Sequence, residues 1–283
     1  MIISIIILNY KTKEFTLSLL DSLFKNYKKE IEENKIEIIL ADNASGDDSI
    51  ASFKKSKHFL KIKIIENKEN FGFSKGNNIA AKEASGTYLL FLNSDTKVMD
   101  KGFLKMTDFL DKNNNIGILG GKLNNENGSR QASCAKFYTP FNLLLMLLGL
   151  ERFGLLRESP SEIKQVDWVS GACLMIKRSL FEKLKGFDES FFMYIEDMEL
   201  CFRAKQAGFL TYFYEDIKLI HKNLGSSNKN FAILNIYKGL LYFYKKHMKN
   251  NYLTVRMMMR LKAKILNFFG KEPYGQALKI LRQ

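Results

Sequence analysis

Asn93-Ser94-Asp95-Thr96 is a cluster of short, oxygen-rich side chains that directly follows an apolar run at 89–92. Such a run is typical of a strand buried on both faces of a sheet, and open α/β sheets bind ligands just outside the carboxyl ends of their strands. A carboxylate at that point, Asp95, suits a hard cation and, through it, a phosphate. The same residue types also favour turns and helix caps, so the tetrapeptide taken alone favours a turn.

A second candidate for chemistry is the carboxylate pair Glu196-Asp197, which follows the aromatic-rich stretch 191–194. Carboxylates are common in the first turn of a helix, because they interact favourably with its dipole, and a helix is expected from Glu196 to about Gly208. The aromatic residues ahead of the pair predict apolar walls, which strengthen a carboxylate as a base. Glu199 and Arg203 are spaced as an ion pair on the same helix.

His221 ends an expected strand at 217–220 and precedes a polar stretch that contains Asn223, Gly225, Ser226 and Ser227. A single histidine is more often structural than a ligand, but its place at a strand end keeps a ligand role open. The chain has three widely spaced cysteines set among apolar residues, which indicates buried free thiols in a reducing compartment and no zinc site. They are Cys134, Cys173 and Cys201.

The elements that must position these residues can be read from hydrophobic spacing. Strands are expected at 2–8, 37–41, 62–65, 88–92, 117–120, 168–176, 212–214 and 217–220. Helices are expected at 14–28, 49–55, 79–84, 103–110, 196–208, 231–247 and 256–269, with a loop at 67–78. The alternation predicts an α/β fold with a parallel, doubly wound sheet, in which the polar strand ends gather at one edge.

The segment 133–166 is less regular, and its apolar run at 143–150 fits either an acceptor-side loop or a core helix. After Trp168, the small residues Gly171 and Ala172 indicate a close approach by another group. The sequence has no Gly-x-Gly-x-x-Gly after the first strand and no Walker motif, which disfavours dinucleotide dehydrogenases and P-loop enzymes. Without a glycine loop, a bound diphosphate would need a metal, and Asp95 is the obvious ligand.

The net charge of +14 is concentrated at the C-terminus, where the residues from Lys245 onward include ten Lys or Arg but a single acid, Glu272. This distribution predicts a local anionic partner rather than a nucleic-acid footprint. The helix at 256–269 mixes basic and apolar residues as an interfacial helix does, although packing onto the body with a solvated basic face explains it too. The N-terminus does not resemble a signal peptide, and 143–150 is too short to span a bilayer. We therefore expect a cytoplasmic protein with peripheral contact to the inner face of the cell membrane.

Taken in order, the motifs resemble those of the family 2 glycosyltransferases, most closely the bacterial rhamnosyltransferase-like branch that builds cell-surface polysaccharides. The resemblance covers residues 2 to about 227 and leaves out the tail beyond about residue 245. The matching residues are Ile-Ile-Leu-Asn9-Tyr10, Asp42-Asn43-x-Ser45-x-Asp47, Asn70-x-Gly72-Phe73-x-x-Gly76-Asn77-Asn78, Leu92-Asn93-Ser94-Asp95-Thr96, Gly171-Ala172 and Gly186-Phe187-Asp188-Glu189-x-Phe191-Phe192-x-Tyr194-x-Glu196-Asp197-x-Glu199-Leu200.

This resemblance implies a GT-A fold, which is a Rossmann-like mixed sheet flanked by helices. It implies a catalytic domain at 1–228, with a nucleotide-binding part to about 120 and an acceptor-binding part at 121–228. The basic residues 229–283 would form a C-terminal helical extension. It also implies an inverting mechanism and a divalent cation, Mg²⁺ or Mn²⁺.

Carried over position by position, the resemblance makes Asp197, beside Glu196, the base on the acceptor hydroxyl and Asp95 the metal ligand, with His221 completing the metal or diphosphate site. Trp168, Gly171 and Ala172 would meet the acceptor or donor sugar. The nucleotide would be held by Asn9, Tyr10, Asp42, Asn70, Gly76, Asn77, Asn93 and Ser94. One departure is that the metal motif reads Asn93-Ser94-Asp95, with one carboxylate where the family usually has two.

The expected function is transfer of a sugar from dTDP-rhamnose or a UDP-sugar to a glycan or polyprenyl-linked acceptor, and a homodimer is compatible with the sequence. One alternative is a non-catalytic membrane-associated scaffold that binds nucleotide-sugars. A sugar nucleotidyltransferase fits less well, because it would need a Gly-rich signature and a Pro-Lys near the first strand, whereas the first proline here is Pro140.

Overall fold

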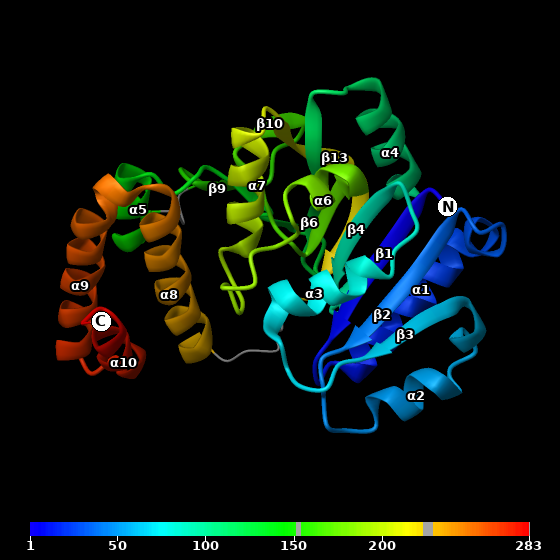
Figure 1. The fold of residues 1–283 in the computed structure, drawn as a ribbon, viewed down its shortest axis with the longest axis horizontal. Coiled ribbons are helices and arrows are strands. Elements are labelled where there is room, and N and C mark those ends of the chain that lie inside the picture. Colours follow the sequence, from blue (N-terminus) through cyan, green and yellow to red (C-terminus); the bar gives the residue numbers. More distant parts are fainter. Residues whose placement is uncertain (151–153, 223–228, 283) are drawn as a thin grey trace.

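The computed structural model describes residues 1–150, 154–222 and 229–282 of the chain (Figure 1). The polar stretch 223–227 and the expected domain boundary at 228 lie outside these residues. The larger sheet runs in the order β10-β13-β6-β12-β4-β1-β2-β3, with β5 beside β13 and β7 beside β6. Its strands are β1 (Ile3–Asn9), β2 (Ile36–Asp42), β3 (Ile62–Glu66), β4 (Tyr88–Asn93), β5 (Thr96–Val98), β6 (Ile116–Asn124), β7 (Arg130–Gln131), β10 (Lys164–Val166), β12 (Cys173–Lys177) and β13 (Leu210–His221).

The sheet is mixed, which confirms the GT-A prediction and corrects the purely parallel sheet expected from alternation alone. β1, β2, β3 and β4 are mutually parallel, whereas β12 runs antiparallel between β4 and β6. The reversal matters for the site, because it brings the beginning of β12 to the carboxyl end of β4. The amide of Asn93 donates to the Ala172 carbonyl at this point.

The polar strand ends gather as expected, because the parallel strands are in register. Asn9 pairs with Asp42 across β1 and β2, and Leu8 pairs with Asn93 across β1 and β4. Side chains alternate between the two faces along each strand, so β1 places Ile5 in one core and Ile6 in the other.

Helices cover both faces of the sheet. Leucine-rich α1 and α4, with α2, pack on one face, and α3, α6 and α7 pack on the other (Figure 1). Their bounds are α1 (Lys13–Glu32), α2 (Ser49–Lys55), α3 (Gly72–Lys82), α4 (Gly102–Lys112), α6 (Arg178–Lys183) and α7 (Glu196–Gln206), with the short turn η1 (Phe59–Lys61).

A smaller sheet and a group of helices complete the fold. The sheet runs β11-β8-β9, and α5 follows β8 along the chain. The C-terminal helices share the core of α3, α6 and α7 through side chains such as Leu240 and Met259, so the extension packs onto the rest of the chain. The bounds are β8 (Cys134–Ala135), α5 (Pro140–Leu147), β9 (Arg157–Glu158), β11 (Trp168–Val169), α8 (Lys229–His247), η3 (Lys249–Asn251), α9 (Tyr252–Phe268) and α10 (Glu272–Ile280).

Several expected elements were wrong in extent. Much of the expected loop at 67–78 belongs to α3, which begins at Gly72. The low helix propensity of glycine and asparagine explains why no helix was expected there. Gly76 is needed within this helix because a Cβ at residue 76 would lie 2.8 Å from the Leu8 side chain. The strand expected at 168–176 is two strands in different sheets, separated at 170–172. The strands at 212–214 and 217–220 are one strand with a bulge, β13, and α10 was missed.

Candidate active site

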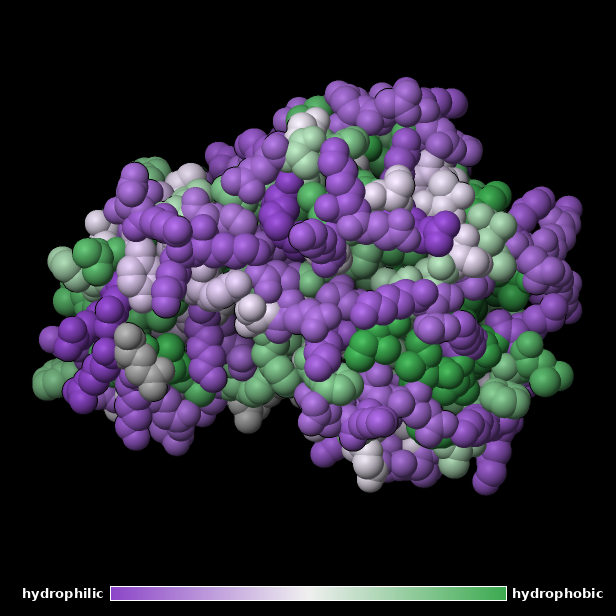
Figure 2. All heavy atoms as spheres, in the orientation of Figure 1, coloured by the Kyte–Doolittle hydropathy of each residue, from purple (hydrophilic) through white to green (hydrophobic). Residues whose placement is uncertain are grey.

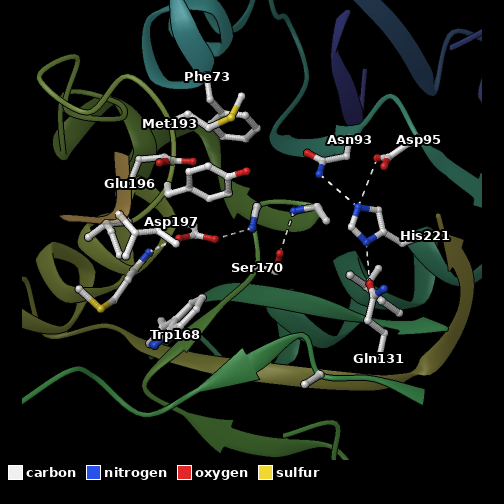
Figure 3. Close-up of a pocket in the computed structure, with 18 of the residues that line it drawn as sticks. Phe73, Asn93, Asp95, Gln131, Trp168, Ser170, Met193, Glu196, Asp197 and His221 are labelled. Carbon is white, nitrogen blue, oxygen red and sulfur yellow. Dashed lines mark hydrogen bonds and ion pairs between the residues drawn. The ribbon is translucent and has the colours of Figure 1, made fainter. Parts of the chain in front are cut away.

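A cavity of about 930 Å³ lies at the gathered strand ends (Figure 3). It is lined by β1, β4 and their following loops on one side, and by the start of β12 and the start of α7 on the other. Of the predicted site residues, the structure brings eleven to its wall. These are Tyr10, Asn70, Asn93, Ser94, Asp95, Trp168, Gly171, Ala172, Glu196, Asp197 and His221.

Four predicted nucleotide ligands lie behind this wall. Asn9 is fully buried: its amide donates to Asp42 (2.6 Å) and Ser45 (3.0 Å), and its carbonyl oxygen accepts from two threonine hydroxyls. Asp42 in turn accepts from the amide and hydroxyl of Ser45. Asn77 donates to the Phe73 carbonyl within α3, and Gly76 packs on β1. In this structure these residues support the wall, so a direct contact between them and a nucleotide remains a prediction.

Asp95 and His221 face each other across one side of the cavity. Asp95 Oδ1 lies 3.2 Å from His221 Nε2, and the amide nitrogen of Asn93 lies 3.4 Å from the same Nε2 (Figure 3). The other ring nitrogen, Nδ1, is 2.6 Å from Gln131 Oε1, an oxygen that can only accept. This contact assigns a proton to Nδ1 and turns Nε2 toward Asp95.

This geometry fits a cation. Nε2 and the Asp95 carboxylate oxygen present lone pairs to each other 3.2 Å apart, and a cation bound between them would bring the two together as ligands. A carboxylate and an imidazole held by a hydrogen bond from its far nitrogen are a common metal-ligand set. Within the described residues no group of three or more His, Cys, Asp and Glu side chains could hold a metal. Further ligands would therefore have to come from water or from a bound phosphate.

Asp197 lies on the opposite side of the cavity and is held by two backbone donors (Figure 3). The amide of Gly171 donates to Oδ2 (3.0 Å), and the amide of Met198 donates to Oδ1 (2.8 Å). A Cβ at residue 171 would lie 3.1 Å from the Phe73 ring and 3.7 Å from the Asp197 Cβ. The small residue expected from the sequence thus lets the carboxylate approach the β11–β12 connection.

A strained turn presents this carboxylate. Tyr194 and Ile195 have φ values of +71° and +76°, a conformation that costs non-glycine residues free energy and is unfavourable above all for a β-branched one. The surrounding structure holds it: the Phe73 amide donates to the Phe192 carbonyl, and Gly239 of α8 allows Ile195 to pack against it. The C-terminal extension therefore braces the turn that begins α7.

A second contact between α7 and α8 is the buried Glu199. It pairs with Arg203 as predicted (2.8 Å), and also with Lys246 (2.7 Å) and His247 (2.9 Å) of α8. Burial alone would raise the pKa of Glu199, but the hydrogen bond from His247, the charge of Arg203 and the hydrogen bond from Lys246 bring the pKa below its ordinary value. Glu199 is thus an anion that joins the extension to the helix carrying Asp197.

Burial raises the pKa of both carboxylates at the start of α7. For Glu196 the pKa is raised well above its ordinary value, first by burial and then by the charge of Asp197, and its Oε2 has no hydrogen-bond partner among the described residues. For Asp197 the amides of Gly171 and Met198 and the charge of Arg157 oppose the effect of burial. Burial without a hydrogen-bond partner thus favours the protonated form of Glu196, whereas two backbone donors favour the carboxylate form of Asp197, the form that can accept a proton from a substrate.

Glu196→Gln should stabilise the protein at alkaline pH. Between the unfolded and the raised folded pKa of Glu196 the folded state binds more protons, so stability falls as pH rises through this window. Glutamine keeps the shape without the buried charge, and we expect Tm to increase by about 3 °C at pH 8.5. Thermal unfolding from pH 5 to 8.5 measures this, with the exposed Glu32→Gln as control; a gain that grows toward acid pH would contradict the assignment.

Several cavity residues were not singled out from the sequence. Gln131 fixes the His221 ring, Asn43 joins Asn70 to the start of α3 (2.8 Å), and Arg157 lies 5.6 Å from the Trp168 ring. Asn43 stands in a motif that was recognised, so its position could have identified it. Gln131 lies on the short strand β7, just before the irregular segment 133–166, and Arg157 lies on β9 within it; no spacing pattern indicated a role for either.

Residues 143–147 of the apolar run form most of α5, with Leu143 and Leu147 buried; Phe141 on the helix and Leu148 just after it are exposed. Trp168 is buried among Tyr138 and Arg157 and donates to the Lys136 carbonyl (2.9 Å). All three cysteines are buried and free, as expected. Within the described part of the chain, no helix combines the length and apolarity that crossing a bilayer requires.

The arrangement of sheet and helices is that of the GT-A class of glycosyltransferases. The structure is similar to that of a mannosyltransferase from Pyrobaculum calidifontis, PcManGT, solved with GDP-Man and Mn²⁺. The TM-score is 0.61 at 15% identity, and the match covers 98% of this chain and 74% of that chain. At this identity the similarity concerns the fold.

The sequence comparisons identify the family. Residues 4–185 match the model described as glycosyl transferase family 2. The chain is 28% identical to the low-salt glycan biosynthesis hexosyltransferase Agl10 of Haloferax volcanii over 72% of this chain and 62% of that protein. It is 26% identical to the rhamnosyltransferase WbbL of Escherichia coli over 77% and 82% of the two chains. The chain belongs to glycosyl transferase family 2, in the rhamnosyltransferase-like branch, as predicted.

Proposed function

We propose that this chain is an inverting glycosyltransferase that moves a sugar from a nucleoside diphosphate to a hydroxyl of a glycan or polyprenyl-linked acceptor in cell-surface polysaccharide synthesis. One observation carries the proposal. A single cavity holds a candidate phosphate-side pair, Asp95 and His221, and a separate candidate base, Asp197, on its opposite side. The similarity to WbbL favours dTDP-rhamnose as donor, with a UDP-sugar as the other candidate.

The chemistry needs two functions from the protein. Asp197 accepts the proton of the acceptor's hydroxyl group while the hydroxyl oxygen forms a bond to the anomeric carbon of the donor sugar. The bond from that carbon to the diphosphate breaks, and the electron pair leaves with the nucleotide. Because the base and the diphosphate side lie on opposite sides of the cavity, the hydroxyl attacks away from the leaving group, and the anomeric configuration inverts. A positioned carboxylate contributes about 10²–10⁴-fold to such a step.

Asp95 and His221 would hold a divalent cation, with Gln131 orienting the ring through Nδ1. The cation supplies neutralisation of the charge that develops on the departing diphosphate. We propose Mn²⁺ over Mg²⁺, since a nitrogen ligand suits Mg²⁺ poorly and the protein offers a single carboxylate in the motif. Mn²⁺ is the ion in the PcManGT complex.

A donor panel tests the function. We expect dTDP-rhamnose or a UDP-sugar with Mn²⁺, at about 100 times its Kd, to stabilise the protein by about 2.7 kcal/mol, which thermal shift detects as several degrees. The same donor should be hydrolysed slowly without acceptor. Free rhamnose and nucleoside without phosphate are the controls. Stabilisation without any hydrolysis or transfer would favour the non-catalytic scaffold, and release of pyrophosphate from a sugar phosphate and a nucleoside triphosphate would favour a nucleotidyltransferase.

A further inference from the structure

The helix α9 is apolar on two opposite faces. One face, with Val255, Met259 and Ala263, is buried against the body. The opposite face exposes another apolar row at four-residue intervals from 253 to 265, followed by Phe268, which is 85% exposed. A surface helix normally places polar residues there, and contiguous exposed apolar side chains mark an interaction surface. The exposed row consists of Leu253, Met257, Leu261, Ile265 and Phe268, followed by Phe269.

The helix α5, which packs against α9, adds to this surface. Phe141 (67% exposed), Leu144 and Leu148 are exposed at helical spacing, and the stretch 137–150 contains no charged residue. In Figure 1 the two helices lie at the same end of the molecule, and Figure 2 shows hydrophobic side chains among hydrophilic ones at that edge. We call the exposed apolar residues of α5 and α9 the apolar face.

Basic side chains border the apolar face. Arg260 and Lys264 are exposed on α9 next to the apolar row, and Lys271 follows the helix. Apolar residues beside a basic border complement an anionic lipid surface, which attracts each such charge while the acyl region takes the apolar side chains. A second copy of the chain fits less well, because a two-fold interface would bring the basic borders of two copies together. Between 229 and 282 the only acidic residue is Glu272.

We propose that α5 and α9 together form a monotopic docking face for an anionic membrane, with both helices lying in the interface. This proposal differs from membrane binding by the basic C-terminal tail alone, because α5, which is far from the tail in sequence, supplies part of the contact with the membrane. The face adjoins the cavity: Met146 of α5 and Ile236 of α8 line the cavity wall. Resting on the proposed function, this position places the acceptor side of the cavity beside the bilayer, where a lipid-linked acceptor is found.

Vesicle flotation of the full chain tests the proposal. Wild type should bind vesicles containing phosphatidylglycerol and bind phosphatidylcholine vesicles at least about tenfold more weakly, with binding reduced by salt. Met257→Ser/Leu261→Ser/Phe268→Ser and Phe141→Ser/Leu148→Ser should each lower binding about tenfold or more. Leu60→Ser, at an exposed apolar residue of η1, is the matched control and should bind as wild type does.

The charge variant Arg260→Gln/Lys264→Gln keeps the proposal testable if an apolar variant fails to fold, since both residues are exposed. It should lose the preference for phosphatidylglycerol, whereas Lys28→Gln/Lys29→Gln on α1 should not.

The proposal would be overturned if wild type does not bind anionic vesicles, or if the α5 variants bind them as wild type does. It would also be overturned if wild type is a dimer that the apolar variants convert to monomer. Donor hydrolysis measured without vesicles reports on the proposed function separately, and these variants should leave it unchanged.

Discussion

Replacing Asp197 with asparagine is expected to lower the rate of sugar transfer by about 10²–10⁴-fold, because the side chain can no longer accept the proton of the attacking hydroxyl. Asparagine retains the shape and one oxygen for the Gly171 amide, so the site should remain assembled. Nucleotide-sugar binding should survive, since the residues proposed to hold the diphosphate lie on the other side of the cavity. Transfer kinetics and a donor titration on the same variant measure the two effects.

The pH profile gives an independent measurement. Because burial raises the pKa of Asp197, the acid limb of kcat/KM should lie above the ordinary range of an aspartate, and the rate should fall as pH drops through that raised pKa. The Asp197→Asn variant should lack this limb. Asp216→Asn, at an exposed carboxylate of β13, is the control. A variant that keeps most of its rate, or a product with retained anomeric configuration, would show that Asp197 is not the base.

The second large effect is expected for Asp95→Ala. Loss of the carboxylate should remove the metal dependence of nucleotide binding and lower kcat/KM by about 10²–10³-fold, the size seen when one electrostatic stabiliser of a transition state is removed. His221→Ala should act in the same direction. Gln131→Leu should have a smaller effect, about tenfold on Mn²⁺ affinity, since it removes the hydrogen bond that orients the ring.

Donor titration by calorimetry with Mn²⁺ and with EDTA checks the role of Asp95, and Asp21→Asn on the outer side of α1 is the control. Wild type should bind the donor more tightly with Mn²⁺, and Asp95→Ala should bind it equally under both conditions. If the variant still responds to Mn²⁺ as wild type does, Asp95 is not the metal ligand. If wild type itself does not respond, Asp95 and His221 do not hold a cation that the donor needs.

The two candidate carboxylates illustrate what a sequence can specify. Asp95 and Asp197 were both identified from local features: an oxygen-rich cluster after a buried strand, and a carboxylate pair after aromatic residues. Residues in the supporting roles were harder to place. Asn9, Gly76 and Asn77 belong to recognised motifs, yet in the structure they contact other parts of the protein and do not line the cavity. Residue type alone does not show whether such a residue faces the cavity or the interior.

By itself, the sequence determined the alternation of strands and helices, the gathering of polar strand ends and, through ordered motifs, the family. These features depend on local hydrophobic spacing and on the residue types at strand ends, both of which can be read directly from the sequence. Tertiary structure decided the direction of β12, the ring orientation of His221 by Gln131 and the bracing of the Tyr194-Ile195 turn by Gly239. It also decided that α5 packs against α9. Each of these is a contact between residues far apart in sequence, and such contacts follow from packing and burial that no local pattern records.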